Sequence, residues 1–199
     1  VWGLSEGAWG VITGTRPYAP VPKTGQTISY TAGDDGDLQM GVAWPNPRFT
    51  DNGDGTVTDN LTDLIWLKNA NCDGTKTWSN AISWANGLYD DCADCGGTNN
   101  DCGLSDGSNV GDWRLPNSRE LHSLIHWGYY VPALSNTAGT GQWTESNPFM
   151  GVQSDGYWSS TTYTGNTSLA WGVYLTYGSV NYYGKGDTYY YVWPVRGGQ

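Results

Sequence analysis

The sequence predicts an α+β fold with two helices and small antiparallel sheets. Helical hydrophobic periodicity is clearest in residues 78–88 and 117–128, whereas residues 157–198 consist of extended segments separated by turns. Helices followed by a run of strands, rather than alternating with strands, are typical of α+β domains. The length of 199 residues suits one domain with a short arm.

Residues 1–45 are predicted to form an extended N-terminal arm, and residues 46–199 the folded domain. Gly and Pro recur throughout the first segment and interrupt both helix and strand patterns. Pro45 and Pro47 mark its end, because the residue before a proline avoids the helical conformation. We expect the arm to pack along the domain or against a neighbouring subunit, which leaves oligomerisation open.

The domain begins with a predicted β-hairpin over residues 48–59, followed by a buried strand at 64–67. Asn-Gly and Asp-Gly dipeptides between extended residues favour a hairpin, because Gly tolerates positive φ. The alternative is an EF-hand calcium loop. Aligning Gly55 with the glycine of that loop places Thr50 at the first ligand position and Leu61 at the twelfth, where Asp and Glu are needed.

Two helices follow, each with a recognisable start. Thr77 can cap the helix at 78–88, and Asn117 with Glu120 forms the pattern of a capping box for the second helix. Gly128 is expected to end the second helix. One face of the first helix is apolar, with side chains at i, i+3, i+4 and i+7: Trp78, Ala81, Ile82 and Ala85.

The four cysteines fall within one Gly-, Asn- and Asp-rich stretch, which is typical of a disulfide-linked loop in an oxidising compartment. Three pairings are open, and we favour Cys72–Cys102 with Cys92–Cys95. The alternative is a zinc site, because Cys92 and Cys95 have the C-x-x-C spacing. A second C-x-x-C, which such sites normally contain, is missing.

The charge balance excludes several classes of partner. A net charge of −10 repels nucleic acid, anionic membranes and sulfated polysaccharides. No run of about 18 apolar residues occurs, so the sequence predicts no membrane insertion.

The sequence contains no recognisable catalytic motif, and we expect the protein not to be an enzyme. Its two histidines, His122 and His126, are spaced i, i+4 and would share one face of the second helix. No third metal ligand accompanies them, so no metal site and no cofactor are predicted. Calcium in one of the Asp-rich turns stays open.

Tyrosine is concentrated near the C-terminus, where nine of the 14 Tyr lie between Tyr157 and Tyr191. Ser, Thr, Gly and Asn stand between them. This mixture resembles antibody paratopes, in which Tyr gives contact area at low entropy cost and small polar residues adapt to the ligand. The alternative, that these Tyr are ordinary strand residues, also stays open.

Strands are predicted at 157–163, 169–177, 179–183 and 189–195, and alternation divides their side chains between two faces. Trp171, Val173, Leu175 and Val180 are expected to face the core. The opposite face and the flanking turns supply the candidate binding residues, which should contribute little to the fold. These residues are Tyr163, Asn166, Gly172, Tyr174, Thr176, Tyr177, Asn181, Tyr183, Asp187 and Tyr189.

Several motifs, in order, resemble those of the Lcl C-terminal domain family, the domain that ends a bacterial collagen-like adhesin. They are Pro47 to Thr62, Ile65-Trp66, Gly111 to Asn117, Glu120-Leu121, Tyr157 to Thr162 and Pro194 to Gly198. The resemblance implies a C-type-lectin-like ligand-binding domain, related to formylglycine-generating enzymes, on a secreted or cell-surface protein. It implies a protein or glycan as the ligand.

The segment after Trp158 also resembles the variable regions of proteins diversified by retroelements. The alternative is a glycan-binding adhesin of fixed specificity. Three departures limit what the resemblance implies. The acidic charge does not suit sulfated glycans, no cysteine follows Cys102 to support formylglycine chemistry, and the Glu-Pro-Asn and Trp-Asn-Asp motifs of calcium lectins are missing.

Overall fold

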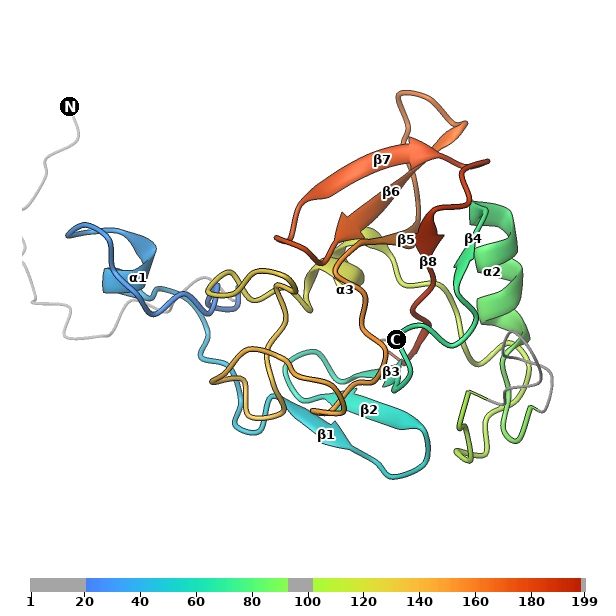
Figure 1. Cartoon of the computed structure of the whole chain (residues 1–199), viewed down its shortest axis with the longest axis horizontal. Helices are drawn as coiled ribbons and strands as arrows, with labels where there is room; N and C mark the ends of the chain where they lie inside the picture. The colour runs from blue at the N-terminus through green and yellow to red at the C-terminus, as the bar shows by residue number, and fades with distance from the viewer. Residues whose placement is uncertain (1–20, 93–101, 198–199) are drawn as a thin grey trace, which may run out of the picture.

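Figure 1 shows the computed structural model, which describes residues 21–92 and 102–197. These residues form two β-sheets and three short helices, so the predicted α+β class is confirmed. The helices are α1 (Asp35–Leu38), α2 (Trp78–Gly87) and α3 (Ser118–His122). The strands are β1 (Phe49–Asp51), β2 (Thr56–Asp59), β3 (Leu64–Leu67), β4 (Thr75–Lys76), β5 (Gly156–Thr162), β6 (Leu169–Tyr174), β7 (Val180–Gly184), β8 (Tyr190–Tyr191) and β9 (Val195–Arg196).

The first sheet has the strand order β1-β2-β3-β9 and begins with the predicted hairpin. β1 and β2 pair antiparallel, and the turn between them contains Gly53 and Gly55 at positive φ. The Asp54 carboxylate accepts a hydrogen bond from the backbone N–H of Thr56, as turn aspartates commonly do. The segment therefore forms a β-turn connection rather than an EF-hand loop.

The second sheet has the order β4-β8-β5-β6-β7 and contains most of the tyrosines. The strand predicted at 189–195 is divided, with β8 in this sheet and β9 in the first. Trp193 lies between them, is fully buried, and donates its indole N–H to the carbonyl of Leu67 at 2.8 Å. Pro194 follows and has no N–H for a ladder. β8 pairs with β5 in parallel, so this sheet is not wholly antiparallel.

Two clusters of buried side chains form the core. The larger lies around the first sheet and includes Trp66, Phe149 and Trp193. The smaller lies between α2 and the second sheet and includes Ala81 and Trp158. α2 is therefore packed over one face of the Tyr-rich sheet.

Both helix starts occur at the predicted residues. At α3, Asn117 accepts from the N–H of Glu120 at 3.0 Å, and Glu120 accepts from the N–H of Asn117 at 2.8 Å, which completes the capping box. Thr77 precedes α2, but its side chain makes no capping hydrogen bond.

The prediction that the second helix extends to Gly128 is wrong, because α3 ends at His122. Ile125 forms a β-bridge with Leu134, and this tertiary pairing replaces the helical hydrogen bonds. His122 and His126 therefore do not share a helical face.

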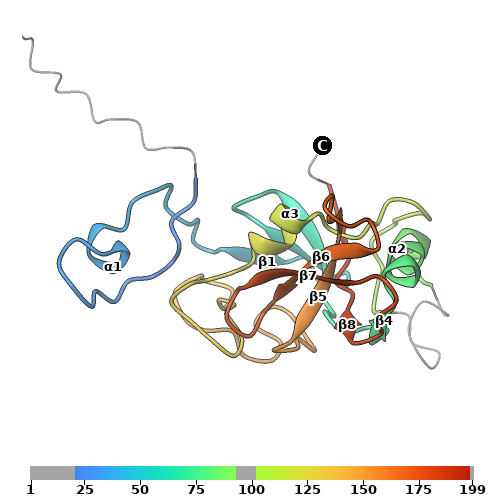
Figure 2. The same cartoon turned by 90° about the horizontal axis from the view of Figure 1, so that it is seen from above.

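The described part of the predicted arm, residues 21–45, is folded back rather than extended. Pro22 and Val42 form a bridge, and α1 lies in the loop between them. Figure 2 shows this loop to one side of the two sheets. Trp44 packs against His126 of the domain with 4.8 Å between ring centroids. The rest of the predicted arm lies outside the described residues.

A buried ion pair joins the hairpin to the segment after α3. Arg48 donates from Nε and Nη2 to the two carboxylate oxygens of Asp59, both at 2.7 Å, and both side chains are fully buried. Nη2 also donates to the carbonyl of Ser123 at 3.0 Å, and the guanidinium lies 4.2 Å from the ring of Trp44. Because a lone buried charge is costly, both partners are needed together.

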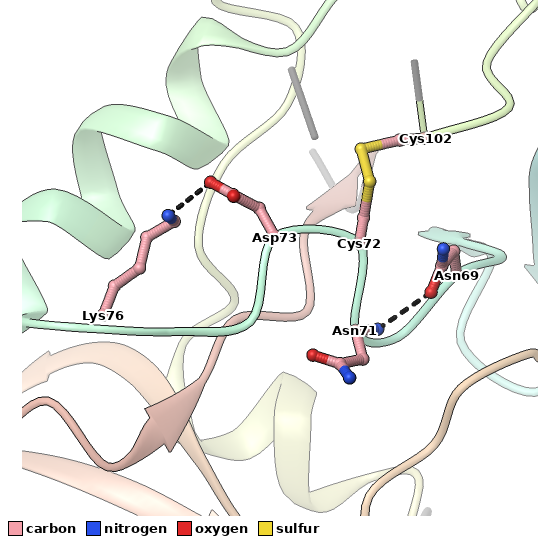
Figure 3. Close-up of a disulfide and its surroundings, with 6 residues drawn as sticks. All are labelled: Asn69, Asn71, Cys72, Asp73, Lys76 and Cys102. Atoms are coloured by element: carbon pink, nitrogen blue, oxygen red, sulfur yellow. Dashed lines mark hydrogen bonds and ion pairs between the residues drawn. A yellow bond between two sulfur atoms is a disulfide. The ribbon is translucent and has the colours of Figure 1, made fainter. Parts of the chain in front are cut away.

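Cys72 and Cys102 form the predicted disulfide, with 5.4 Å between their Cα atoms (Figure 3). On the chain-entropy account, a link of this separation stabilises the fold by about 3–4 kcal/mol. Cys92 is also disulfide-bonded. The predicted pairing of Cys92 with Cys95 involves a residue outside the described part of the chain.

Candidate binding site

The ten predicted binding residues do not form one surface, because they are divided between the two faces and the ends of the second sheet. The register between β6 and β7 determines on which face each residue lies. Gly172 pairs with Asn181, so these residues share a face with Tyr174. Tyr182 lies on the opposite face, where it stacks on Tyr163.

The first face carries a tyrosine platform, which we define as Tyr174, Tyr183 and Tyr190. Ring centroids are 4.3 Å apart for Tyr183 and Tyr190 and 5.7 Å apart for Tyr174 and Tyr183. A Cβ atom added to Gly172 would lie 3.4 Å from the ring of Tyr183, and one on Gly156 would lie 2.6 Å from that of Tyr190. Glycine at position 156 therefore lets the ring of Tyr190 lie close to the sheet, whereas a Cβ at position 172 would only touch the ring of Tyr183.

The platform belongs partly to the core, which corrects the expectation that this face is outward. Tyr174 and Tyr183 are half-buried against the cluster beneath α2, Tyr190 is buried, and Gly172 is buried as well. Burial raises the pKa of Tyr183 to about 12, with a further contribution from Tyr174. Burial also raises the pKa of Tyr190. Both phenols are therefore neutral at physiological pH.

The opposite face carries an aromatic cluster formed by Tyr163, Trp171 and Tyr182. Tyr163 and Tyr182 stack at 4.4 Å with nearly parallel planes, and Trp171 meets both edge-on at about 5.5 Å. Trp171 was expected in the core and is half-buried here. Val180 was also expected to face the core, but it is 37% exposed.

Three exposed aromatic residues lie on or beside the strands of this sheet. Tyr177 is 60% exposed in the turn between β6 and β7, and Tyr189 is 76% exposed just before β8. Tyr182, on β7, is 48% exposed and was not among the predicted residues. Because side chains alternate along a strand, Tyr182 shares a face with Val180, and this face was predicted to be the core face. Asn181 is exposed on the other face of β7.

The remaining predicted residues make local hydrogen bonds. Thr176 donates from its hydroxyl to the carbonyl of Ser154 at 2.7 Å. Asn166 accepts from the N–H and hydroxyl of Ser168, which closes the turn between β5 and β6. Asp187 donates its backbone N–H to the carbonyl of Gly184, in the turn after β7. These three residues shape the turns around the sheet.

The two histidines occupy different environments. His122 lies on α3, with its Nε2 3.2 Å from the carbonyl oxygen of Gly178. His126 is buried, with its ring stacked on Tyr129 at 4.2 Å. Burial and the nearby charge of Arg48 lower the pKa of His126 to about 4. Its imidazole is therefore neutral at physiological pH.

Within residues 21–92 and 102–197, no three or more His, Cys, Asp or Glu side chains are grouped so as to hold a metal ion. No helix in the same part of the chain is long and apolar enough to cross a membrane.

These features define a disulfide-linked α+β domain that presents exposed aromatic side chains on the edge strand β7, in the turn between β6 and β7, and just before β8. Residues 55–196 match the Lcl C-terminal domain family, and the chain belongs to this family. The match extends from the hairpin turn to β9 and includes the whole Tyr-rich sheet. No curated protein and no solved structure matches the chain.

Proposed function

We propose that this protein is a secreted or cell-surface binding module that recognises a protein or glycan ligand through the exposed part of its Tyr-rich sheet. The observation that carries the proposal is the group of solvent-exposed aromatic residues at the border of that sheet: Tyr177, Tyr182 and Tyr189. Tyrosine combines a large apolar surface with a polar hydroxyl and few rotatable bonds, which suits it to interfaces.

The division between platform and border supports the finer parts of the proposal. A surface whose residues are rewritten by a retroelement must keep its fold when they change. Tyr177, Asn181 and Tyr189 are exposed and can be replaced at small cost, whereas Tyr183 and Tyr190 support the core. We therefore propose a C-type-lectin-like domain in which the exposed border is diversified. The second candidate is an adhesin with a fixed glycan ligand.

The Cys72–Cys102 disulfide supports a location outside the reducing cytosol, because such links persist in oxidising compartments. We further propose that the protein acts by binding and carries out no catalysis. Neutral His126 is enclosed by aromatic rings, and His122 faces a backbone carbonyl, so neither is paired with a nucleophile.

The proposal is tested by screening the whole chain against a glycan array and an array of secreted proteins. Any ligand found is then measured against a variant in which Tyr177, Tyr182 and Tyr189 are all changed to Ser. We expect the Kd to rise at least about 30-fold, as for the loss of an interface anchor worth about 2 kcal/mol. Tyr30→Ser is the matched control, because Tyr30 is 77% exposed but lies on the arm. Unchanged affinity in the triple variant would contradict the proposed site.

Diversification has its own test. A near-copy of the 3′ coding segment beside a reverse transcriptase gene is expected if the border is rewritten. Its absence would favour the adhesin of fixed specificity and leave the binding function intact.

A further inference from the structure

We propose that strand β7 binds an extended, basic polypeptide segment, which adds to the second sheet as a further strand. This inference rests on the proposed binding function and names the class of partner and the mode of recognition. β7 is the last strand in the order β4-β8-β5-β6-β7, and Figure 1 shows it at the upper border of the sheet.

The backbone of β7 offers hydrogen-bonding groups on its outer side. The backbone N–H of Tyr174 donates to the carbonyl of Ser179, and the backbone N–H of Lys185 donates to the carbonyl of Ser168, both at 2.9 Å. In an antiparallel pair every second residue bonds to the partner strand, and the register continues unbroken between these two bonds. Asn181 and Tyr183 therefore bond to β6, and the intervening residues face away from it.

The outward residues of β7 are Val180, Tyr182 and Gly184. The carbonyl of Gly184 accepts the N–H of Asp187, so the turn occupies that group. In the part of the chain that the structure describes, no other segment pairs with the outer N–H and C=O groups of Val180 and Tyr182. A polypeptide strand added there would complete the ladder at both residues.

β7 also lacks the features by which proteins usually prevent strand addition. Such edges commonly carry charged residues, proline or a bulge, or are very short. β7 has five residues, none of them charged or proline, and its register with β6 has no bulge. The edge strand β1, by contrast, has three residues and carries Asp51, which is paired with Lys68 at 2.6 Å. β4, at the other edge of the same sheet, has two residues, including Lys76.

The side chains beside this edge differ between the two faces. On one face Val180 and Tyr182 are exposed and apolar, next to the stacked ring of Tyr163. On the other face Asn181 is exposed and polar. Directly opposed side chains on neighbouring strands interact most strongly. The edge therefore suits a strand whose residues alternate between apolar and polar.

The hydrogen-bonding groups of the β7 edge and the net charge of the chain indicate which class of molecule binds there. Donors and acceptors that alternate at the spacing of a strand are provided by polypeptide backbone, which favours a peptide segment over a glycan. The chain carries 19 Asp and Glu against nine Lys and Arg, so a second copy would bring the same net charge of −10. A basic segment is attracted instead.

The test uses the whole chain and a designed peptide of nine residues, in which Thr alternates with Val and Tyr and Lys stands at both ends. Amide hydrogen exchange is measured by NMR with and without the peptide at millimolar concentration. We expect at least tenfold slower exchange at Val180 and Tyr182, and little change at Asn181 and Tyr183, which already bond to β6. A peptide N-methylated at two successive central residues, which blocks both of its edges, should give no protection.

Two variants separate backbone from side-chain effects. Tyr182→Pro removes an outward N–H without removing a bond to β6, and it should abolish the protection at Val180. Tyr182→Phe keeps the backbone and should retain it. An unchanged circular dichroism spectrum and melting temperature for both variants would show that the fold is intact. If Tyr182→Pro unfolds, Val180→Lys, which places a like charge beside the incoming lysines, should weaken protection by the peptide.

Three outcomes would overturn the inference. No protection at millimolar peptide would exclude strand addition at β7. Protection that grows with protein concentration in the absence of peptide would identify a second copy as the occupant. Glycan binding that depends on Tyr177 and Tyr189 while exchange at Val180 is unchanged would support the proposed function and reject strand addition. If the array screen finds no ligand but the peptide still protects Val180 and Tyr182, strand addition is supported and the proposed function as stated is rejected.

Discussion

The two faces of the five-stranded sheet both carry aromatic clusters, but their surroundings differ. The tyrosine platform lies on the face that α2 covers, where Tyr190 is buried and Tyr183 half-buried. The aromatic cluster on the other face ends at Tyr182, which is 48% exposed on the edge strand. A tyrosine therefore supports the fold where other elements cover it, as at Tyr190 beneath α2 and at Tyr157 on the central strand β5. It is available to a ligand where nothing in the described part of the chain covers it fully, as at Tyr182 on the edge strand.

The largest effect should come from Trp158, on which the platform rests. Its side chain is fully buried, and its indole N–H donates to the carbonyl of Lys76 at 2.8 Å. Trp158→Ala removes this packing, leaves a cavity and deprives the carbonyl of its donor. We expect a loss of about 3–5 kcal/mol in the free energy of unfolding, measured by denaturant titration. A loss below about 1 kcal/mol would show that the cluster beneath α2 is not part of the core.

A smaller effect is expected where the platform touches the sheet. A Cβ atom at position 172 would lie 2.8 Å from the carbonyl oxygen of Tyr157, which is closer than van der Waals contact. Gly172→Ala should therefore force the backbones of β5 and β6 apart at this position and cost about 1–3 kcal/mol of stability. Gly186→Ala is the matched control, because no heavy atom lies within 4 Å of a Cβ built there. Equal melting temperatures for the two variants would mean that β5 and β6 can separate at position 172 at little cost.

Local signals in the sequence predicted the elements that depend on neighbouring residues. The hairpin at 48–59 follows from its turn dipeptides, and α3 starts where its capping box predicts. The end of α3 could not be predicted, because Ile125 leaves the helix to bridge Leu134, a tertiary contact. The division of 189–195 between two sheets likewise depends on where the indole of Trp193 is buried.

The candidate site was predicted only in part, for a related physical reason. Alternation shows that Tyr182 and Tyr183 point to opposite faces, but it does not show which face a distant helix covers. α2 packs on the face that was predicted to be outward, so Tyr183 is half-buried. Val180 is exposed because it lies on the edge strand, whereas Val173, its partner on the same face, is fully buried. The sequence also does not show that β7 is the edge strand.

The raised pKa of the Tyr183 phenol can be measured by alkaline titration. Tyr183 ionises at about 12 in the folded protein, above the ordinary value of 10, because burial disfavours the phenolate. A raised pKa means that the unfolded state loses its proton first. The stability that this neutral phenol contributes is therefore complete below pH 10 and is lost as the pH rises toward 12. The difference in phenolate absorbance between the protein and Tyr183→Phe should appear near pH 12, and a difference centred at pH 10 would contradict the buried environment.

The smallest effect on stability is expected at the edge, where the effect on binding should be greatest. Tyr182→Ser removes a half-exposed ring that stacks only on its neighbours in the aromatic cluster, so stability should fall by less than about 1 kcal/mol. Tyr183→Ser removes a ring packed against Tyr190 and the cluster beneath α2, and it should cost more. Affinity for a ligand found by the array screen should change in the opposite order, with the greater loss in Tyr182→Ser. If Tyr183→Ser instead weakens binding more while both variants melt alike, the platform is the recognition surface and the edge is not.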